Sequence, residues 1–173
     1  MILEIKTFPS EVLRKKAEEV TEFNEELHTL LDNMLETMYE AKGIGLAAPQ
    51  VGVSKRFFVL DDLTGPDNKN PMEIINPVFL EKEGEILEEE GCLSIPGEYA
   101  YVKRYMKVQV KYQDRFGNEK IVEATDRLSR ILQHESDHLD GTLFIDRLPN
   151  TKRETIKKHV KKRINQGDYQ VNP

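Results

Sequence analysis

The segment of the chain with the clearest chemical potential is His134-Glu135-Ser136-Asp137-His138, two histidines four residues apart with a carboxylate beside the first. On a helix that turns about 100° per residue, the two imidazoles fall about 40° apart and one turn along the axis, so both can reach one metal ion. Glu135 then lies near the centre of an apolar arc, where an unpaired carboxylate is costly and a cation with bound water would be a suitable partner. The arc consists of Leu128, Ile131, Leu132 and Leu139. A charged surface helix that matches the pattern by chance is the alternative.

Cys92 is the only cysteine, which excludes an intrachain disulfide and fits a reducing compartment. It lies between Glu90-Gly91 and Leu93-Ser94, in a stretch flanked by glycine and proline rather than in an apolar run. This setting is unusual for a thiol that merely fills a core. A thiolate with two imidazoles would supply three protein ligands and leave a fourth tetrahedral position for water, as catalytic metal sites do.

A third segment, Gly43-Ile44-Gly45-Leu46-Ala47-Ala48-Pro49-Gln50, contains two glycines and two alanines. Side chains this small allow another backbone to approach closely. A plain loop after a helix is the other interpretation of this segment.

Hydrophobic spacing and turn residues predict the elements that must position these segments. The expected helices are a short one over Glu11–Lys16 with Ser10 as its N-cap, a long one over Glu25–Ala41 that ends at Gly43, one over Arg127–Asp140 with Asp126 as N-cap and Gly141 as its stop, and a C-terminal one over Lys152–Arg163. The expected strands are Phe57–Leu60, Glu73–Leu80, Tyr99–Val102, Val108–Tyr112 and Ile121–Ala124. The order helix, strands, helix predicts an α+β fold.

Length and composition narrow the range of functions. The chain has 173 residues, of which 38% are hydrophobic and 32% charged, so we expect one folded domain over residues 1–165 and a loose tail over 166–173. A net charge of -6 disfavours binding to DNA or to an anionic membrane. No secretory leader or long apolar run is visible, and we expect a cytoplasmic protein.

Taken together, the segments Gly43–Gln50, Glu90–Ser94 and Gln133–Gly141 resemble, in this order, the three signature motifs of peptide deformylases. The resemblance covers nearly the whole chain. It implies antiparallel β-sheets packed around a central metal-binding helix, with a long N-terminal helix and a C-terminal helix. It also implies an enzyme that removes the formyl group from N-terminal formylmethionine of new polypeptides and releases formate.

The resemblance also assigns roles at the site. Cys92, His134 and His138 are implied as ligands of one divalent ion, Fe²⁺ in the cell, whereas the residue types themselves suit Zn²⁺, Ni²⁺ or Co²⁺ as well. Glu135 is implied as the catalytic acid and base. The Gln50 side chain and the Leu93 N–H would hold the developing oxyanion, and Gly45 belongs to the same catalytic group. Residues expected to contact the substrate are Ile44, Gly45, Glu90, Gly91, Tyr99, Arg127 and Ile131.

Two positions depart from the family pattern: Arg127 and Glu88 stand where apolar or aromatic pocket residues are more usual. We expect them to form an ion pair across the pocket rim, with their aliphatic stems against the methionine side chain of the substrate.

Two other functions compete with the deformylase interpretation. A metallopeptidase that cuts internal peptide bonds would account for the two histidines and the glutamate between them, although not for the other two segments. A non-catalytic ribosome-associated protein with a structural metal would use the segment Lys152–Arg163, which has seven lysine or arginine residues and one glutamate. That segment is also a candidate ribosome contact for an enzyme, although a solvated charged face is the more usual role of such a segment.

Overall fold

The computed structural model describes residues 1–173, and its largest element is a five-stranded antiparallel sheet in the order β1-β2-β3-β6-β7. The strands are β1 (Gly45–Ala47), β2 (Phe57–Asp61), β3 (Pro71–Glu83), β6 (Lys107–Gln113) and β7 (Glu119–Thr125). A second sheet is the hairpin of β4 (Ile86–Cys92) and β5 (Ile95–Arg104). The predicted mixed α+β architecture with antiparallel sheets is confirmed.

Strand β2 is buried along its whole length because helices cover both of its faces. Phe57 and Val59 pack with the apolar residues of α1 (Glu25–Glu40), and Phe58 and Leu60 pack with those of α2 (Asp126–Leu139). This alternation follows from the two-residue period of a strand. It explains why the strand reads as an unbroken apolar run.

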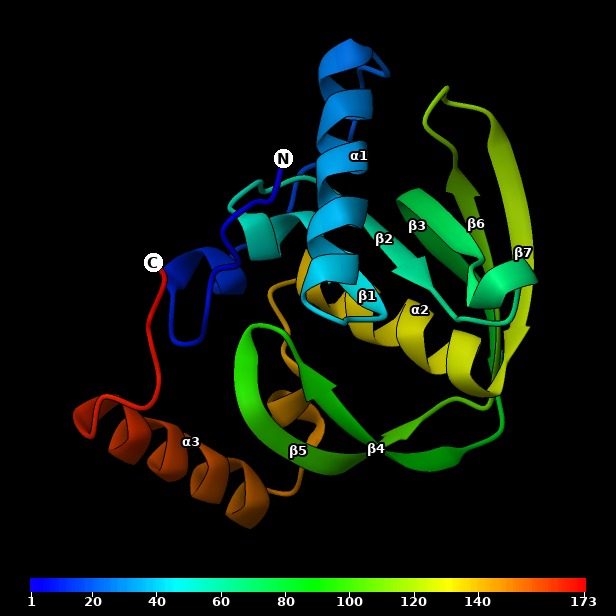
Figure 1. Ribbon diagram of the computed structural model, residues 1–173. Helices are drawn as coiled ribbons and strands as arrows, with labels where there is room; N and C mark the ends of the chain where they lie inside the picture. The colour runs from blue at the N-terminus through cyan, green and yellow to red at the C-terminus, as the bar shows by residue number, and fades with distance from the viewer.

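Helix α2 carries the two candidate histidine ligands through the middle of the molecule, between the five-stranded sheet and the β4–β5 hairpin (Figure 1). Helix α3 (Asn150–Asn165) lies on the outside and buries only Ile156 and Val160. Both apolar side chains join a cluster with Ile95 and Val102 of β5. No helix is both long and apolar enough to cross a bilayer.

Several element predictions need correction. Strands β1 and β4 were missed, since β1 has small side chains and β4 contains three consecutive glutamates, so neither shows an apolar alternation. The predicted helix Glu11–Lys16 is a short 3-10 turn over Glu11–Arg14, and the Ser10 side chain does not cap it. Helix α2 begins at Asp126 itself rather than after it. Further short 3-10 turns are η2 (Ala48–Val51), η3 (Pro66–Asn68) and η4 (Phe144–Arg147).

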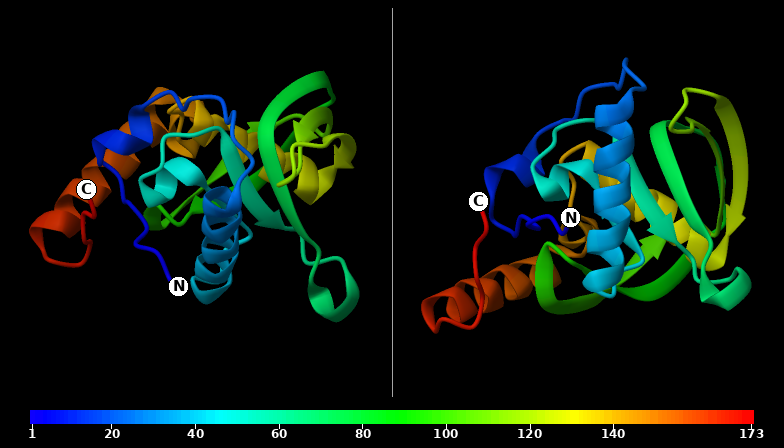
Figure 2. Two further views of the ribbon diagram at one scale, coloured as in Figure 1. Left: turned by 90° about the horizontal axis from the view of Figure 1, so that it is seen from above. Right: turned by 45° about the horizontal axis from the view of Figure 1, so that its top comes forward.

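Residues 166–173, expected to form a loose tail, are packed and hydrogen-bonded. After α3 the chain turns back through Gly167, which has a positive φ, and the C-terminal end lies beside the N-terminal part of the chain (Figure 2). Tyr169 is 5% exposed and belongs to a buried cluster, and Asn172 bonds to Thr7. Most of these contacts reach backbone groups more than 160 residues away, which no local pattern could predict.

Candidate metal centre and substrate pocket

Cys92, His134 and His138 converge, and their ligand atoms all lie within 4.8 Å of one another. Helix α2 presents the two rings one turn apart, and the end of β4 brings Cys92 to face them. The Cys92 Sγ is 3.4 Å from His138 Nε2. These spacings fit a tetrahedral ion, whose bonds to sulfur and nitrogen are roughly 2.0–2.3 Å long.

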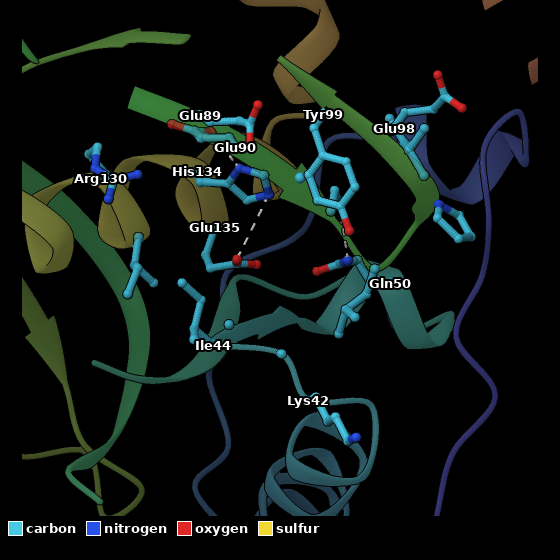
Figure 3. Close-up of a pocket in the computed structure, with 18 of the residues that line it drawn as sticks. Lys42, Ile44, Gln50, Glu89, Glu90, Glu98, Tyr99, Arg130, His134 and Glu135 are labelled. Carbon is cyan, nitrogen blue, oxygen red and sulfur yellow. Dashed lines mark hydrogen bonds and ion pairs between the residues drawn. The ribbon is translucent and has the colours of Figure 1, made fainter. Parts of the chain in front are cut away.

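Glu135 is 5% exposed and its Oε1 is buried without a hydrogen-bond partner. Its Oε2 is 3.9 Å from His134 Nε2, so the carboxylate faces the ligand cluster, as Figure 3 shows. Burial raises the pKa of Glu135 to about 7, despite the opposing charge of His134. A Cβ at position 45 would collide with this carboxylate, so any residue other than glycine there would displace it. An unpartnered buried carboxylate oxygen requires a partner, and a water on a cation in the cluster would supply it.

The ring of His134 is oriented by Glu90, whose Oε1 lies 2.9 Å from His134 Nδ1. Since a carboxylate only accepts hydrogen bonds, Nδ1 carries the proton and Nε2 is left for the cluster. The Arg104 guanidinium donates to both oxygens of the Glu90 carboxylate, at 2.9 and 3.0 Å. It also donates to the Asp137 carboxylate at 2.7 Å. Burial alone would raise the pKa of Glu90, but the hydrogen bonds from His134 and Arg104 outweigh it and lower the pKa to about 2.

Gln50 and Leu93 present hydrogen-bond donors next to Cys92. The Gln50 Oε1 accepts the Ala47 N–H at 2.9 Å, which fixes the amide so that its Nε2 donates to Ser94 Oγ at 3.0 Å and to Cys92 Sγ at 3.6 Å. The backbone N–H of Leu93 makes no hydrogen bond within the chain. The Leu93 N–H is therefore free to donate to an atom beside the cluster, and the Gln50 amide can join it by giving up its long contact with Cys92 Sγ.

The cluster opens into a pocket of about 470 Å³ between β1 and β4 (Figure 3). Both strands lie at the edge of their sheets, so each has one side free of strand partners. An extended peptide can add to such an edge through its backbone. Predicted substrate residues that line this pocket are Ile44, Gly45, Glu90, Gly91, Tyr99 and Ile131.

The predicted ion pair between Arg127 and Glu88 is wrong. No such pair exists, and neither residue lines the pocket. Arg127 lies in the first turn of α2 and donates to the Asp62 carbonyl at 3.3 Å, on the loop after β2. The direction in which the Arg127 side chain points depends on how α2 crosses the sheet, and the sequence does not reveal that crossing.

Other residues of the site were missed by sequence reasoning. Ser94 is fully buried and lies within the motif segment Glu90–Ser94, so its position two residues after Cys92 was a usable signal. Arg104 had none, since its partners lie 14 and 33 residues away. Lys42 and Arg130 also line the pocket, and the Arg130 Nε is buried without a partner.

Comparison with known proteins agrees with this geometry. The family model described as polypeptide deformylase matches residues 2–154. A peptide deformylase of Thermodesulfovibrio yellowstonii is 55% identical over 160 residues, which cover 92% of this chain and 97% of that one. The crystal structure of a peptide deformylase from Legionella pneumophila has a TM-score of 0.90 at 43% identity, covering 98% of this chain and 99% of that one. That from Thermus thermophilus has a TM-score of 0.88 at 41% identity, covering 97% and 98%. The chain belongs to the polypeptide deformylase family.

Proposed function

We propose that this chain is a metal-dependent hydrolase that removes the formyl group from N-terminal formylmethionine of newly made polypeptides and releases formate. One observation carries the proposal: a thiol and two imidazoles meet beside a buried carboxylate that has an unpartnered oxygen, at the end of a pocket between two edge strands. The family of the chain supports the same reaction.

Cys92, His134 and His138 would hold one divalent cation. Such an ion lowers the pKa of a coordinated water molecule and polarises the formyl carbonyl. Glu90 and Arg104 serve this arrangement by keeping the proton of His134 on Nδ1. A thiolate donates more charge than a carboxylate, which weakens the ion as a Lewis acid. We infer that a formyl group, small and electrophilic, needs less activation than an internal peptide bond.

Glu135 moves the proton. Its raised pKa, about 7, suits a group that takes a proton from water at one step and returns it to the departing amine at the next. The oxygen of that water forms a bond to the formyl carbon, and the bond from this carbon to nitrogen then breaks as the amine takes up the proton, so that formate and a free N-terminus are the products.

Gln50 and Leu93 stabilise the negative charge that develops on the formyl oxygen. The Gln50 Nε2, which Ser94 orients, and the Leu93 N–H, which has no partner in the chain, are the two donors that we assign to this role. A single donor of this kind is worth roughly 10²–10³ in kcat in other enzymes.

The substrate lies extended between β1 and β4, where Ile44, Gly45 and Gly91 offer backbone groups and thus no side-chain selectivity. Selectivity for methionine comes from the apolar part of the pocket, formed by Ile44, Ile131 and the carbon face of His134. Tyr99 is 65% exposed at the outer end and would meet residues further along the peptide.

The test measures metal content and formate release on the same protein samples. Purified without oxygen, the protein should contain about one equivalent of divalent metal and release formate from formyl-Met-Ala-Ser. Cys92→Ser and His138→Ala should lose both, whereas His28→Ala, a histidine outside the cluster, should keep both. Retained metal in the two ligand variants, or cleavage of internally placed bonds without formate, would refute the assignment.

Ferrous iron is the ion we propose for the cell, with zinc, nickel or cobalt as substitutes. Since ferrous iron beside a thiolate is vulnerable to oxygen, the iron form should lose activity in air faster than the zinc or nickel form. Elemental analysis after anaerobic purification identifies the ion, and equal lifetimes of the forms would contradict iron sensitivity.

We also propose that the enzyme works in the cytoplasm at the ribosome, where formylated chains are made. The basic segment Lys152–Arg163 lies entirely within α3 and keeps most of its lysines exposed, including Lys158, Lys161 and Lys162. A cationic helix face of this kind suits contact with ribosomal RNA.

A further inference from the structure

The two proposed oxyanion donors share a support formed by the two ends of the chain. Leu93 and Ser94 occupy the tight turn between β4 and β5, and Gln50 lies in η2. An extended N-terminal segment runs behind both. The Phe8 N–H donates to the Ser94 carbonyl and the Lys6 N–H to the Gln50 carbonyl, each at 2.7 Å.

The return segment, residues 166–173, holds this N-terminal segment from the opposite side. Thr7 donates through its N–H to the Asn172 carbonyl at 3.1 Å and through its hydroxyl to the Gln170 carbonyl at 2.7 Å. The Asn172 side chain donates to the Ile5 carbonyl at 2.9 Å. The N-terminal segment is thus hydrogen-bonded on one side to the donor-bearing backbone and on the other to the return segment.

Tyr169 links the return segment to the donor turn directly. Its hydroxyl lies 2.8 Å from the Phe8 carbonyl and 3.3 Å from the Ser94 carbonyl. The ring is almost fully buried, and the Arg163 guanidinium of α3 lies over it at 5.3 Å. Arg163 in turn donates to Glu98 at 2.7 Å on β5. The phenol is therefore held rigidly against the turn.

The Ser94 side chain links this turn to Gln50, one of the two proposed donors. Ser94, whose carbonyl Tyr169 and Phe8 both contact, accepts the Gln50 amide on its hydroxyl at 3.0 Å. A shift of this turn would move the Leu93 N–H and release the Gln50 amide together. A misplacement of about 1 Å in such a constellation can cost about 10²-fold in rate.

We propose that Tyr169 and the return segment are a positioning element for catalysis, which holds the Leu93–Ser94 turn so that Gln50 Nε2 and the Leu93 N–H face the formyl oxygen. This role rests on the proposed function of these two donors. The return segment lies beyond residues 2–154, the part of the chain that the family model matches. The last eight residues are accordingly part of the catalytic support and not a spacer after α3.

The test is Tyr169→Phe, which deletes the hydroxyl and keeps the ring under Arg163. With equal metal content, kcat on formyl-Met-Ala-Ser should fall about tenfold while KM changes less than about twofold, because donors to the developing charge act in the transition state. Thr37→Val is the matched control. It deletes another buried hydroxyl, one that joins α1 to Leu3 of the N-terminal segment, and should lower stability without lowering kcat.

A double-mutant cycle separates positioning from general loosening. Gln50→Ala alone should reduce kcat about 10²-fold, and Tyr169→Phe should then cost less than about threefold more, because the group that it positions is gone. Hydrogen exchange of the zinc form should be faster at Phe8 and in residues 92–95 of Tyr169→Phe, and unchanged there in Thr37→Val.

The outcomes distinguish the positioning role of Tyr169 from the donor role of Gln50. Unchanged kcat in Tyr169→Phe, or the same fold loss in both backgrounds, overturns the positioning role while leaving Gln50 as a donor. Unchanged kcat in Gln50→Ala overturns the assigned donor and the positioning role with it.

Discussion

Helices α2 and α3 are similar in length yet treat their polar side chains in opposite ways. Helix α2 buries nine residues, most of them polar, including Gln133, His134, Glu135 and His138. Helix α3 buries only Ile156 and Val160 and leaves its charges in water. Burying polar groups is unfavourable unless each has a partner, whereas solvated charges cost little and contribute little. A buried polar helix therefore indicates a site, and a charged exposed helix indicates at most a contact surface.

The most direct test of this comparison is the substitution of Glu135, the carboxylate on α2 that lacks a partner. Glu135→Gln keeps the shape of the side chain and removes its ability to carry a proton. We expect kcat for formate release to fall at least about 10³-fold with unchanged metal content, since the same group acts as base and as acid.

Ser136→Ala is the control for that substitution. Ser136 is the neighbouring residue on α2 and also has a buried, unpartnered oxygen, but it does not line the pocket. Its kcat should stay within about twofold of the original enzyme. Substantial turnover in Glu135→Gln would remove the assigned acid and base and leave the burial of polar groups on α2 without a catalytic reason.

A smaller effect is expected at Glu90, which supports α2 from β4. Glu90→Gln weakens the orientation of His134, and the loss of such a partner typically costs about 10–100-fold in metal affinity. Competition with a chelator measures it. Glu83→Gln, on an exposed carboxylate of β3 that faces Lys107 at 3.8 Å, should leave metal affinity unchanged.

The same substitution changes how stability depends on pH. The pKa of Glu90 falls from its ordinary 4.5 to about 2 in the folded protein, so its contribution is fully present above pH 4.5 and disappears as pH falls toward 2. The shift corresponds to about 3 kcal/mol at most. The stability deficit of metal-free Glu90→Gln, measured by urea unfolding, should therefore be largest at pH 7 and shrink below pH 4.5. A deficit that stays constant with pH would mean that the charge of Glu90 is not the stabilising feature.

The contrast between the helices also explains which features the sequence could predict. Helix α2 was predictable because its apolar residues recur with the helical period. The convergence of Cys92, His134 and His138 was predictable because metal chemistry demands particular side chains at particular spacings. Arg104, Tyr169 and the true surroundings of Arg127 depend on contacts between distant segments. Strand β4 stayed hidden because Glu88 and Glu89 are exposed and Glu90 is turned to His134, so the strand shows no apolar alternation.

The smallest effect on chemistry is expected on α3. The double reversal Lys161→Glu with Lys162→Glu alters two exposed side chains that form no ion pair, so stability should change by less than about 0.5 kcal/mol and kcat/KM on short formyl peptides by less than about twofold. Binding to ribosomes should weaken about tenfold at low salt, because like charges would then face the RNA. Reversal of Lys15 and Lys16, an exposed pair after η1, changes the net charge equally and should leave binding intact. If both double variants bind ribosomes equally, the charge of α3 serves solubility alone. Truncation is unsuitable for this question, because it would also remove the buried Tyr169.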